Sequence, residues 1–308
     1  MFDVAISQVT TPRWELPQEL ASLSASGFER MSLWRPKLSD TGVAASVRLL
    51  DAAGVKVSSL QWAGGFTGGD GRSFAESVDD ALEAIDAAQA LGAGVLVVHA
   101  GCRGGHTRTH ATRLLLQAVE ALLPRAREAG VVLAVKPVHA TAGGCGFLTG
   151  LNEALDLVDR CADPSLRLTL DLWHFGHEPC LGGLIERLAE AAALVQVADR
   201  CEPPSACADR LPAGHGSLPL EALLGDLLDA GYGGPVEFDP VGEAVEILGY
   251  EGVLRETRLV ADAWLQHRSA GRQPIAAGAP TRTGHARHHL RPAGSRRSHA
   301  SSHIASPG

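Results

Sequence analysis

The chain has 308 residues and a net charge of −8, and residues 1–268 are more acidic than the whole because the last forty residues carry six arginines and no acid. An acidic body argues against nucleic-acid binding, and no apolar run approaches the ~20 residues of a membrane helix. The six cysteines form no CxxC pair and the chain opens on a strand-like run, so we expect a reduced, cytoplasmic setting.

Apolar, strand-like runs alternate with amphipathic, helical stretches. The predicted strands are 2–8, 28–35, 55–62, 94–100, 131–138, 166–173, 194–199 and 235–240. The predicted helices lie near 16–26, 42–53, 73–91, 107–129, 151–161, 181–192, 218–230 and 253–267. Eight strand-then-helix units predict an α/β fold, a (β/α)8 TIM barrel over residues 1–268. An open doubly wound sheet is the alternative, but no GxGxxG turn follows the first strand.

Residues 269–308 differ in composition from the rest of the chain. They are rich in Gly, Ala, Pro, Arg, Ser and His and contain only three large aliphatic residues, Ile275, Leu290 and Ile304. Such a segment buries too little apolar surface to offset its ordering entropy, so we predict a disordered basic tail. The tail could touch an anionic partner, but a solvated extension is the simpler interpretation.

Lys136 is the most informative residue, because it ends an otherwise apolar run, Val131–Val138. Burial disfavours an ammonium group, so this lysine needs an anion, a ligand or a lowered pKa. Asp171, Gln196 and Asp239 end three later strands in the same way. Side-chain alternation along each strand directs all four toward the barrel axis, together with Glu237. The sequence therefore predicts that they meet at the C-terminal end of the barrel, where TIM-barrel sites lie.

Three segments from the fifth strand onward match the motifs of a known family. Strand five reads Leu-Ala-Val-Lys-Pro-Val-His at 133–139, where the family has a Glu-Pro-Leu-His run, and strand six reads Asp-Leu-Trp-His at 171–174, the family's Asp-x-x-His. The loop after strand seven reads Arg-Leu-Pro-Ala-Gly-His-Gly at 210–216, close to the family's Arg…Pro-Gly-x-Gly. Each motif is weak alone, but the ordered set is specific. Over roughly residues 2–264, and most closely from the fourth strand onward, the sequence resembles the xylose-isomerase-like sugar phosphate isomerase/epimerase barrels.

The resemblance implies one divalent cation of the Mg, Mn or Zn class, bound by residues from strands five to eight. The corresponding positions here are Lys136, Asp171, Gln196 and Asp239. Asp171, Gln196 and Asp239 have oxygens that can bind a hard cation, whereas an ammonium has no lone pair and repels one. A retained metal is therefore doubtful. We expect Lys136→Glu to create tight metal binding if the other three ligands are intact.

Three interpretations of Lys136 stay open. Its ammonium could replace the metal charge and pair with Asp171, Glu237 or Asp239, stabilising an enolate. It could instead lose its proton and act as a Schiff-base nucleophile or general base, although nearby carboxylates oppose this. In the third interpretation catalysis has been lost and the lysine only neutralises the former ligands.

Five further residues are candidates for substrate binding. The resemblance places His139 and His174 beside the substrate; alternatively, they only orient Asp171 or the backbone. Arg210, in a Gly/Pro-rich loop over the barrel mouth, could clamp an anionic or carbonyl oxygen, with a rim salt bridge as the alternative. His215 stands between two glycines and carries a weaker signal, and Trp62 could be an apolar wall or simply packing.

The function that the resemblance implies is an isomerase or epimerase. It would abstract a proton next to a carbonyl of a small polyhydroxy or keto substrate, with Lys136, Asp171, Glu237 and Asp239 as catalytic candidates. A dehydratase-like lyase, mildly favoured by Gln196, and a non-catalytic small-molecule-binding protein are the alternatives. A homodimer is the expected assembly if there is one, since this barrel class often dimerises.

Overall fold

The eight predicted strands form a closed, all-parallel barrel in sequence order, β1 next to β2 and so on to β8, which pairs with β1. The computed structural model describes residues 2–142, 146–206 and 208–271. The strands are β1 Asp3–Ser7, β2 Arg30–Trp34, β3 Lys56–Gly64, β4 Val95–His99, β5 Val132–Lys136, β6 Leu166–Asp171, β7 Ala192–Val197 and β8 Pro235–Phe238. The TIM-barrel prediction is confirmed.

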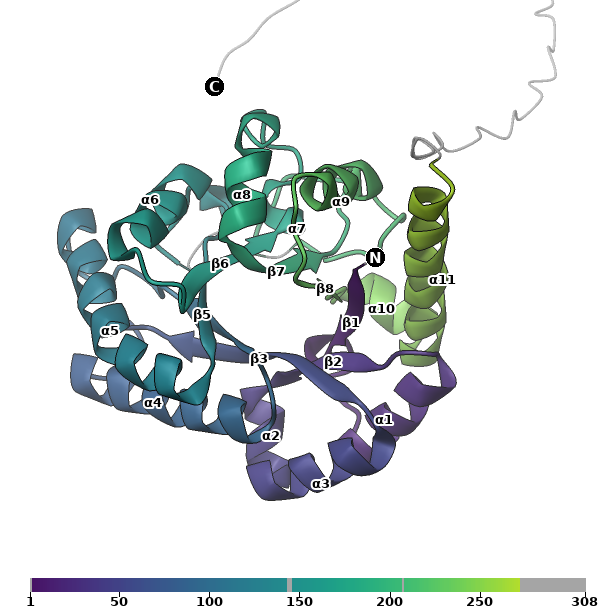
Figure 1. Ribbon diagram of the computed structural model, residues 1–308, viewed down its shortest axis with the longest axis horizontal. Helices are drawn as coiled ribbons and strands as arrows, with labels where there is room; N and C mark the ends of the chain where they lie inside the picture. Colours follow the sequence, from purple (N-terminus) through teal and green to yellow (C-terminus); the bar gives the residue numbers. More distant parts are fainter. Residues whose placement is uncertain (1, 143–145, 207, 272–308) are drawn as a thin grey trace, which may run out of the picture. The chain divides into compact units, whose positions relative to one another are not determined.

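Helices surround the barrel (Figure 1). They are α1 Leu16–Ala25, α2 Arg35–Thr41, α3 Val43–Ala53, α4 Phe74–Ala90, α5 Arg108–Ala129, α6 Leu151–Cys161, α7 Leu172–Phe175, α8 Ile185–Ala191, α9 Leu220–Asp229, α10 Glu243–Leu248 and α11 Tyr250–Ser269. Three short 3-10 helices lie at Gln8–Thr10, Ala140–Ala142 and Gly182–Leu184. In the described part of the chain, no helix has both the length and the apolar character needed to cross a membrane.

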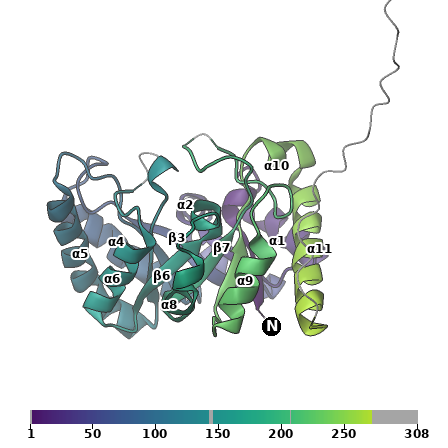
Figure 2. The same ribbon diagram turned by 90° about the horizontal axis from the view of Figure 1, so that it is seen from above.

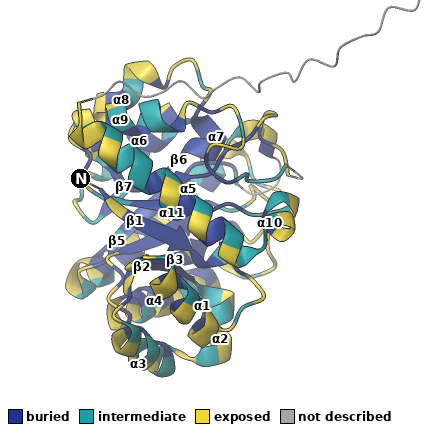
Figure 3. Ribbon diagram, turned by 90° about the vertical axis from the view of Figure 1, so that its right-hand side faces the viewer, coloured by how far each residue is buried: buried dark blue, intermediate teal, exposed yellow. Residues whose placement is uncertain are grey.

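The main hydrophobic core lies between the strands and the helices. The helices turn buried faces toward the sheet and exposed faces outward (Figure 3), and their buried residues join those of the strands in one cluster. A second, small cluster inside the barrel contains Val97, Ala134 and Leu194. The layer of the barrel interior that these residues form is therefore apolar.

A polar level follows the apolar one toward the strands' C-terminal ends. Strand register pairs His99 with Lys136, Asp171 with Gln196 and Gln196 with Glu237. Parallel neighbours in register present their side chains at one height, which brings these residues together. Figure 2 shows the loops after the strands and α10 at one end of the barrel, with the N-terminus at the other end.

Some local predictions were wrong: among others, the seventh strand is Ala192–Val197 rather than 194–199. The sixth strand ends at Asp171 rather than at residue 173, because the Asp171 carboxylate accepts a hydrogen bond from the Trp173 N–H and caps α7. The short helices α2 and α10 were not predicted at all. Of the predicted tail, Ser269 belongs to α11, and residues 272–308 lie outside the described residues.

Candidate active site

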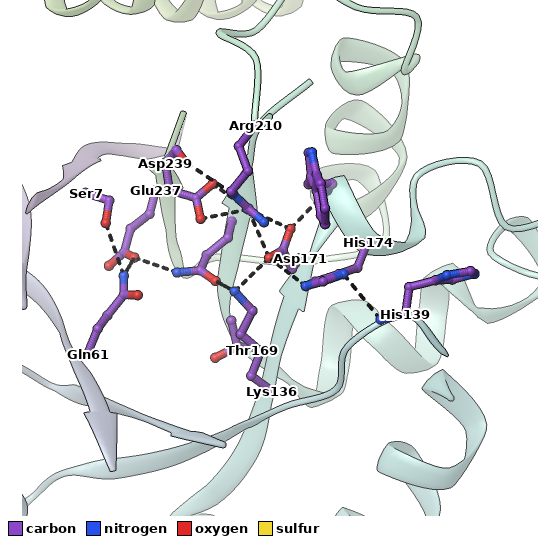
Figure 4. Close-up of polar contacts among 12 residues, drawn as sticks. Ser7, Gln61, Lys136, His139, Thr169, Asp171, His174, Arg210, Glu237 and Asp239 are labelled. Atoms are coloured by element: carbon purple, nitrogen blue, oxygen red, sulfur yellow. Dashed lines mark hydrogen bonds and ion pairs between the residues drawn. The ribbon is translucent and has the colours of Figure 1, made fainter. Parts of the chain in front are cut away.

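Lys136 is held by two of the residues predicted to surround it. Its Nζ lies 2.7 Å from Asp171 Oδ2 and donates to Gln196 Oε1 at 2.6 Å, with only 8% of the lysine side chain exposed (Figure 4). A buried ammonium needs compensation of this kind, and the geometry supplies both a charge and a dipole. The lysine at the end of β5 is thus a satisfied cation.

Arg210 is a second cation at the same place. Its Nη2 lies 3.0 Å from both carboxylate oxygens of Asp171 and 2.7 Å from both oxygens of Asp239. The guanidinium carbon lies 4.9 Å from the centre of the Trp173 ring, and Nε donates to the Asp239 carbonyl at 3.2 Å. One guanidinium nitrogen therefore joins the acidic residues of β6 and of the β8 terminus.

The two aspartates that share Arg210 differ in acidity. Burial by itself would raise the pKa of Asp171, but Arg210 and Lys136 hold that pKa well below its usual range. Burial raises the pKa of Asp239 to about 6, because Arg210 offsets the lost solvation only in part and the Asp171 charge adds to the rise. Asp239 is thus the carboxyl suited to exchange a proton near neutral pH.

Glu237 lies deeper in the barrel than Asp239 and is fully buried. Its carboxylate accepts from Ser58 Oγ at 2.7 Å, from Gln61 Nε2 at 3.1 Å and from Gln196 Nε2 at 3.3 Å. Burial raises its pKa. Gln196 therefore links the two levels, accepting from Lys136 and donating to Glu237.

His174 faces the cluster as a neutral imidazole. Burial lowers its pKa to about 3, although Asp171 opposes this. Its Nδ1 accepts from the backbone N–H of His139 at 3.2 Å, which leaves the proton on Nε2, 3.8 Å from Asp171 Oδ2. The His139 ring points away from Asp171 (Figure 4) and contacts Glu178 and Thr141 at 2.8 and 2.6 Å. His139 thus orients His174 through its backbone.

Two aromatic rings lie beside the cluster at the ends of β3 and β4. Desolvation and the nearby Lys136 charge lower the pKa of His99, the register neighbour of Lys136, to about 3. The Trp62 ring packs edge-on against His99, with centroids 5.4 Å apart, and 45% of Trp62 is exposed. Trp62 is the most exposed of the candidate substrate-binding residues in this cluster.

His215 lies apart from the cluster. Its Nε2 contacts Glu256 of α11 at 2.9 Å, and both side chains are about two-fifths exposed. The Pro-Gly loop therefore brings Arg210 to the carboxylates and turns His215 outward.

Some contributors were missed by the sequence reasoning. Asp199 organises the loop that carries Arg210: its carboxylate accepts from the backbone N–H groups of Arg200, Gly214 and Leu218 at 2.8, 3.1 and 3.0 Å. Gly216 is required there, since a Cβ would lie 2.3 Å from Asp199 Oδ1. Ser58 and Gln61, which hold Glu237, had left a signal as polar residues within an apolar run.

The sequence profile of the xylose isomerase-like TIM barrel family matches residues 17–257. The chain belongs to this family. A Streptomyces coelicolor relative named "Putative hydroxypyruvate isomerase" is 28% identical over 262 residues, covering 78% of this chain and 90% of its own.

Two solved structures share the fold. The IolI protein with a bound zinc atom is 16% identical with a TM-score of 0.75, covering 86% of this chain and 98% of its own. D-psicose 3-epimerase from Clostridium cellulolyticum H10, solved with D-tagatose, is 13% identical with a TM-score of 0.69, covering 86% and 99%.

The metal that the xylose isomerase-like family implies does not fit the side chains of this chain. The oxygens of Asp171, Gln196 and Asp239 that would face a cation already accept from Lys136 Nζ or Arg210 Nη2. Across the described residues, no group of three or more His, Cys, Asp or Glu side chains is arranged to hold a metal ion. Two protein cations, Lys136 and Arg210, fill the space between these three side chains.

Proposed function

We propose that this protein is an isomerase or epimerase that moves a proton next to the carbonyl of a small polyhydroxy or keto compound. One observation carries the proposal: the buried Lys136 and the partly buried Arg210 lie beside Asp239, whose pKa is about 6. Enolisation needs a proton acceptor next to positive charge that stabilises the developing oxyanion. The names of the hydroxypyruvate isomerase and psicose epimerase relatives support the reaction class.

The two cations have donors to spare for a substrate. Lys136 has three N–H groups, of which two point to Asp171 and Gln196. Arg210 Nη1 has no hydrogen-bond partner among the described residues. These donors suit an enediolate oxygen or a substrate carboxylate. Asp171 and Gln196 already engage Nζ, so we prefer this role to a Schiff base. Borohydride would trap Lys136 with a carbonyl substrate only in the Schiff-base case.

Asp239 is the best candidate for the proton acceptor. The lowered pKa of Asp171 makes that carboxylate a poor base, and Glu237 is fully buried beneath Gln196. Neutral His174, with its proton on Nε2, is suited to donate a hydrogen bond to a substrate oxygen.

The relative's name suggests hydroxypyruvate as the first substrate to test. In that reaction Asp239 would take a proton from C3, the C2 oxygen would gain negative charge beside Lys136 and Arg210, and a proton would return to C2. The hydroxyl proton on the C3 oxygen would move to the C2 oxygen. The carbonyl is thereby transferred from C2 to C3 without net oxidation.

A non-catalytic binding protein is the second candidate. The observation in its favour is that Arg210 and Lys136 already neutralise Asp171 and Asp239, the carboxylates that would otherwise act on a substrate. A binding protein would use the spare donors without moving a proton.

Hydrogen exchange in D2O separates the two candidates. Incubated with hydroxypyruvate, and separately with a panel of ketoses, the protein should exchange the substrate C–H next to the carbonyl, seen by proton NMR. Asp239→Asn and Lys136→Met should each lower the exchange rate by about a hundredfold or more. Asp229→Asn, at an exposed site in α9, is the matched control. Calorimetric binding of a compound without any exchange would favour the binding protein and refute the isomerase.

A further inference from the structure

The position between Asp171 and Asp239 is occupied by one nitrogen of the protein. Arg210 Nη2 lies within 3.0 Å of four carboxylate oxygens, two from each aspartate. These aspartates come from the end of β6 and from directly after β8, where the family resemblance places metal ligands. A guanidinium nitrogen therefore takes the contacts that a cation would make there.

Lys136 completes the substitution on the β5 side. Its Nζ contacts Asp171 Oδ2 and Gln196 Oε1, so the oxygen of each remaining candidate ligand already accepts from a protein cation. The negative charges of Asp171 and Asp239 are also balanced by the positive charges of Lys136 and Arg210. A divalent ion entering this site would meet two positive groups and no uncommitted carboxylate among these ligands.

Arg210 is fixed both by its backbone and by its side chain. Its backbone N–H and C=O pair with those of Val241, both at 2.8 Å, just beyond the Asp239 that it binds. The guanidinium also packs on Trp173, and only 16% of the side chain is exposed. A metal would have to displace a guanidinium that is fixed by the backbone pairing with Val241, by packing on the Trp173 ring and by bonds to two carboxylates.

We propose that the divalent-metal site of this barrel has become a permanent two-cation site, with Arg210 Nη2 in the place of the metal and Lys136 excluding a fourth ligand. Metal binding returns only when both cations are removed. The proposal goes beyond the proposed reaction and does not depend on it, because metal binding is measured without a substrate. It also revises the expectation that Lys136→Glu alone creates a metal site.

The test is titration of Mn²⁺ by calorimetry, with thermal unfolding recorded with and without Mn²⁺. The proteins are the wild type, Lys136→Glu, Arg210→Ala and the double variant Lys136→Glu/Arg210→Ala. Lys56→Glu, at the exposed start of β3, is the control for the added charge. We expect one Mn²⁺ equivalent in the double variant alone, bound at least about a hundredfold more tightly than by the wild type. Mn²⁺ should raise the Tm of that variant only.

Three results would overturn the proposal. Tight stoichiometric Mn²⁺ binding by the wild type would show that the cations do not exclude metal. A complete site in Lys136→Glu alone would show that Arg210 is displaced easily. A folded double variant without metal binding would show that Asp171, Gln196 and Asp239 are not a ligand set.

The double variant gathers uncompensated carboxylates and could fail to fold without metal. The neutral variant Lys136→Gln/Arg210→Ala removes both cations and adds no acid. It should gain Mn²⁺-dependent thermal stability that the wild type lacks, and the same Tm with and without Mn²⁺ in this folded variant would contradict the proposal.

Discussion

At the scale of single residues, Asp171 and Asp239 share one arginine nitrogen and have opposite pKa shifts. Asp171 contacts both Arg210 and Lys136 and also accepts from the Trp173 N–H. Asp239 contacts Arg210 and lies close enough to the Asp171 charge for that charge to raise its pKa. Like charges that share a counter-ion separate into a strong and a weak acid.

The raised pKa of Asp239 has a consequence for stability. Between its ordinary value of 3.8 and about 6, the folded protein holds this proton while the unfolded chain has released it. The contribution of Asp239 to stability is therefore complete below about pH 4 and is lost as the pH rises through 6. Between these values, the free energy of unfolding of the wild type should fall by about 1 to 3 kcal/mol relative to Asp239→Asn.

Urea unfolding at a series of pH values measures that difference. For Asp229→Asn, on the exposed side of α9, the difference from the wild type in the free energy of unfolding should not change by this amount between pH 4 and 6. A pH-independent difference for Asp239→Asn would contradict the raised pKa.

At the scale of elements, the loop between β7 and α9 brings Arg210 into the site. It pairs back on itself between Asp199 and Leu211 and then with the segment after β8 between Arg210 and Val241. Asp199 is 2% exposed and satisfies three backbone N–H groups of this loop. Through these bonds Asp199 holds the loop that carries Arg210.

Asp199→Ala should therefore destabilise the protein. The substitution leaves three loop N–H groups without their acceptor, and we expect a loss of about 2 to 4 kcal/mol in the free energy of unfolding. Denaturant unfolding measures this loss, with Asp226→Ala, at an exposed position of α9, as the control. A loss no larger than that of the control would show that the loop holds Arg210 without Asp199.

At the scale of the whole molecule, the last helix completes the layer of helices around the barrel. The Trp264 ring of α11 packs on Phe238 of β8, with centroids 5.7 Å apart, and Arg258 lies 5.8 Å from the centre of the Phe28 ring. Val253, Leu254 and Ala261 of α11 are buried. The barrel thus needs the chain as far as α11.

A chain ended after Gly271 should keep the stability of the full protein, because the sequence beyond it has too few apolar residues to add to the core. Its free energy of unfolding should lie within about 0.5 kcal/mol of the full chain. A chain ended at Gly249, which lacks α11, should lose cooperative unfolding. Marked destabilisation of the chain that ends after Gly271 would refute the prediction of a disordered tail.

The sequence by itself determined the barrel and the level at which the polar residues meet. Strand-then-helix order and the two-residue alternation of strands are local patterns, and they placed Lys136, Asp171, Gln196 and Glu237 on the barrel axis. The register of the observed strands agrees with this placement.

Only the tertiary structure decided what these residues bind. Arg210 lies 39 residues from Asp171 and 29 from Asp239 in the sequence. Its position beside both carboxylates depends on the backbone contacts that its loop makes with Asp199 and Val241. The same loop turns His215 toward Glu256. The opposite pKa shifts of Asp171 and Asp239 follow from distances of a few ångströms between charges. Local periodicity carries no information about such distances, because they depend on how separate loops fold over one another.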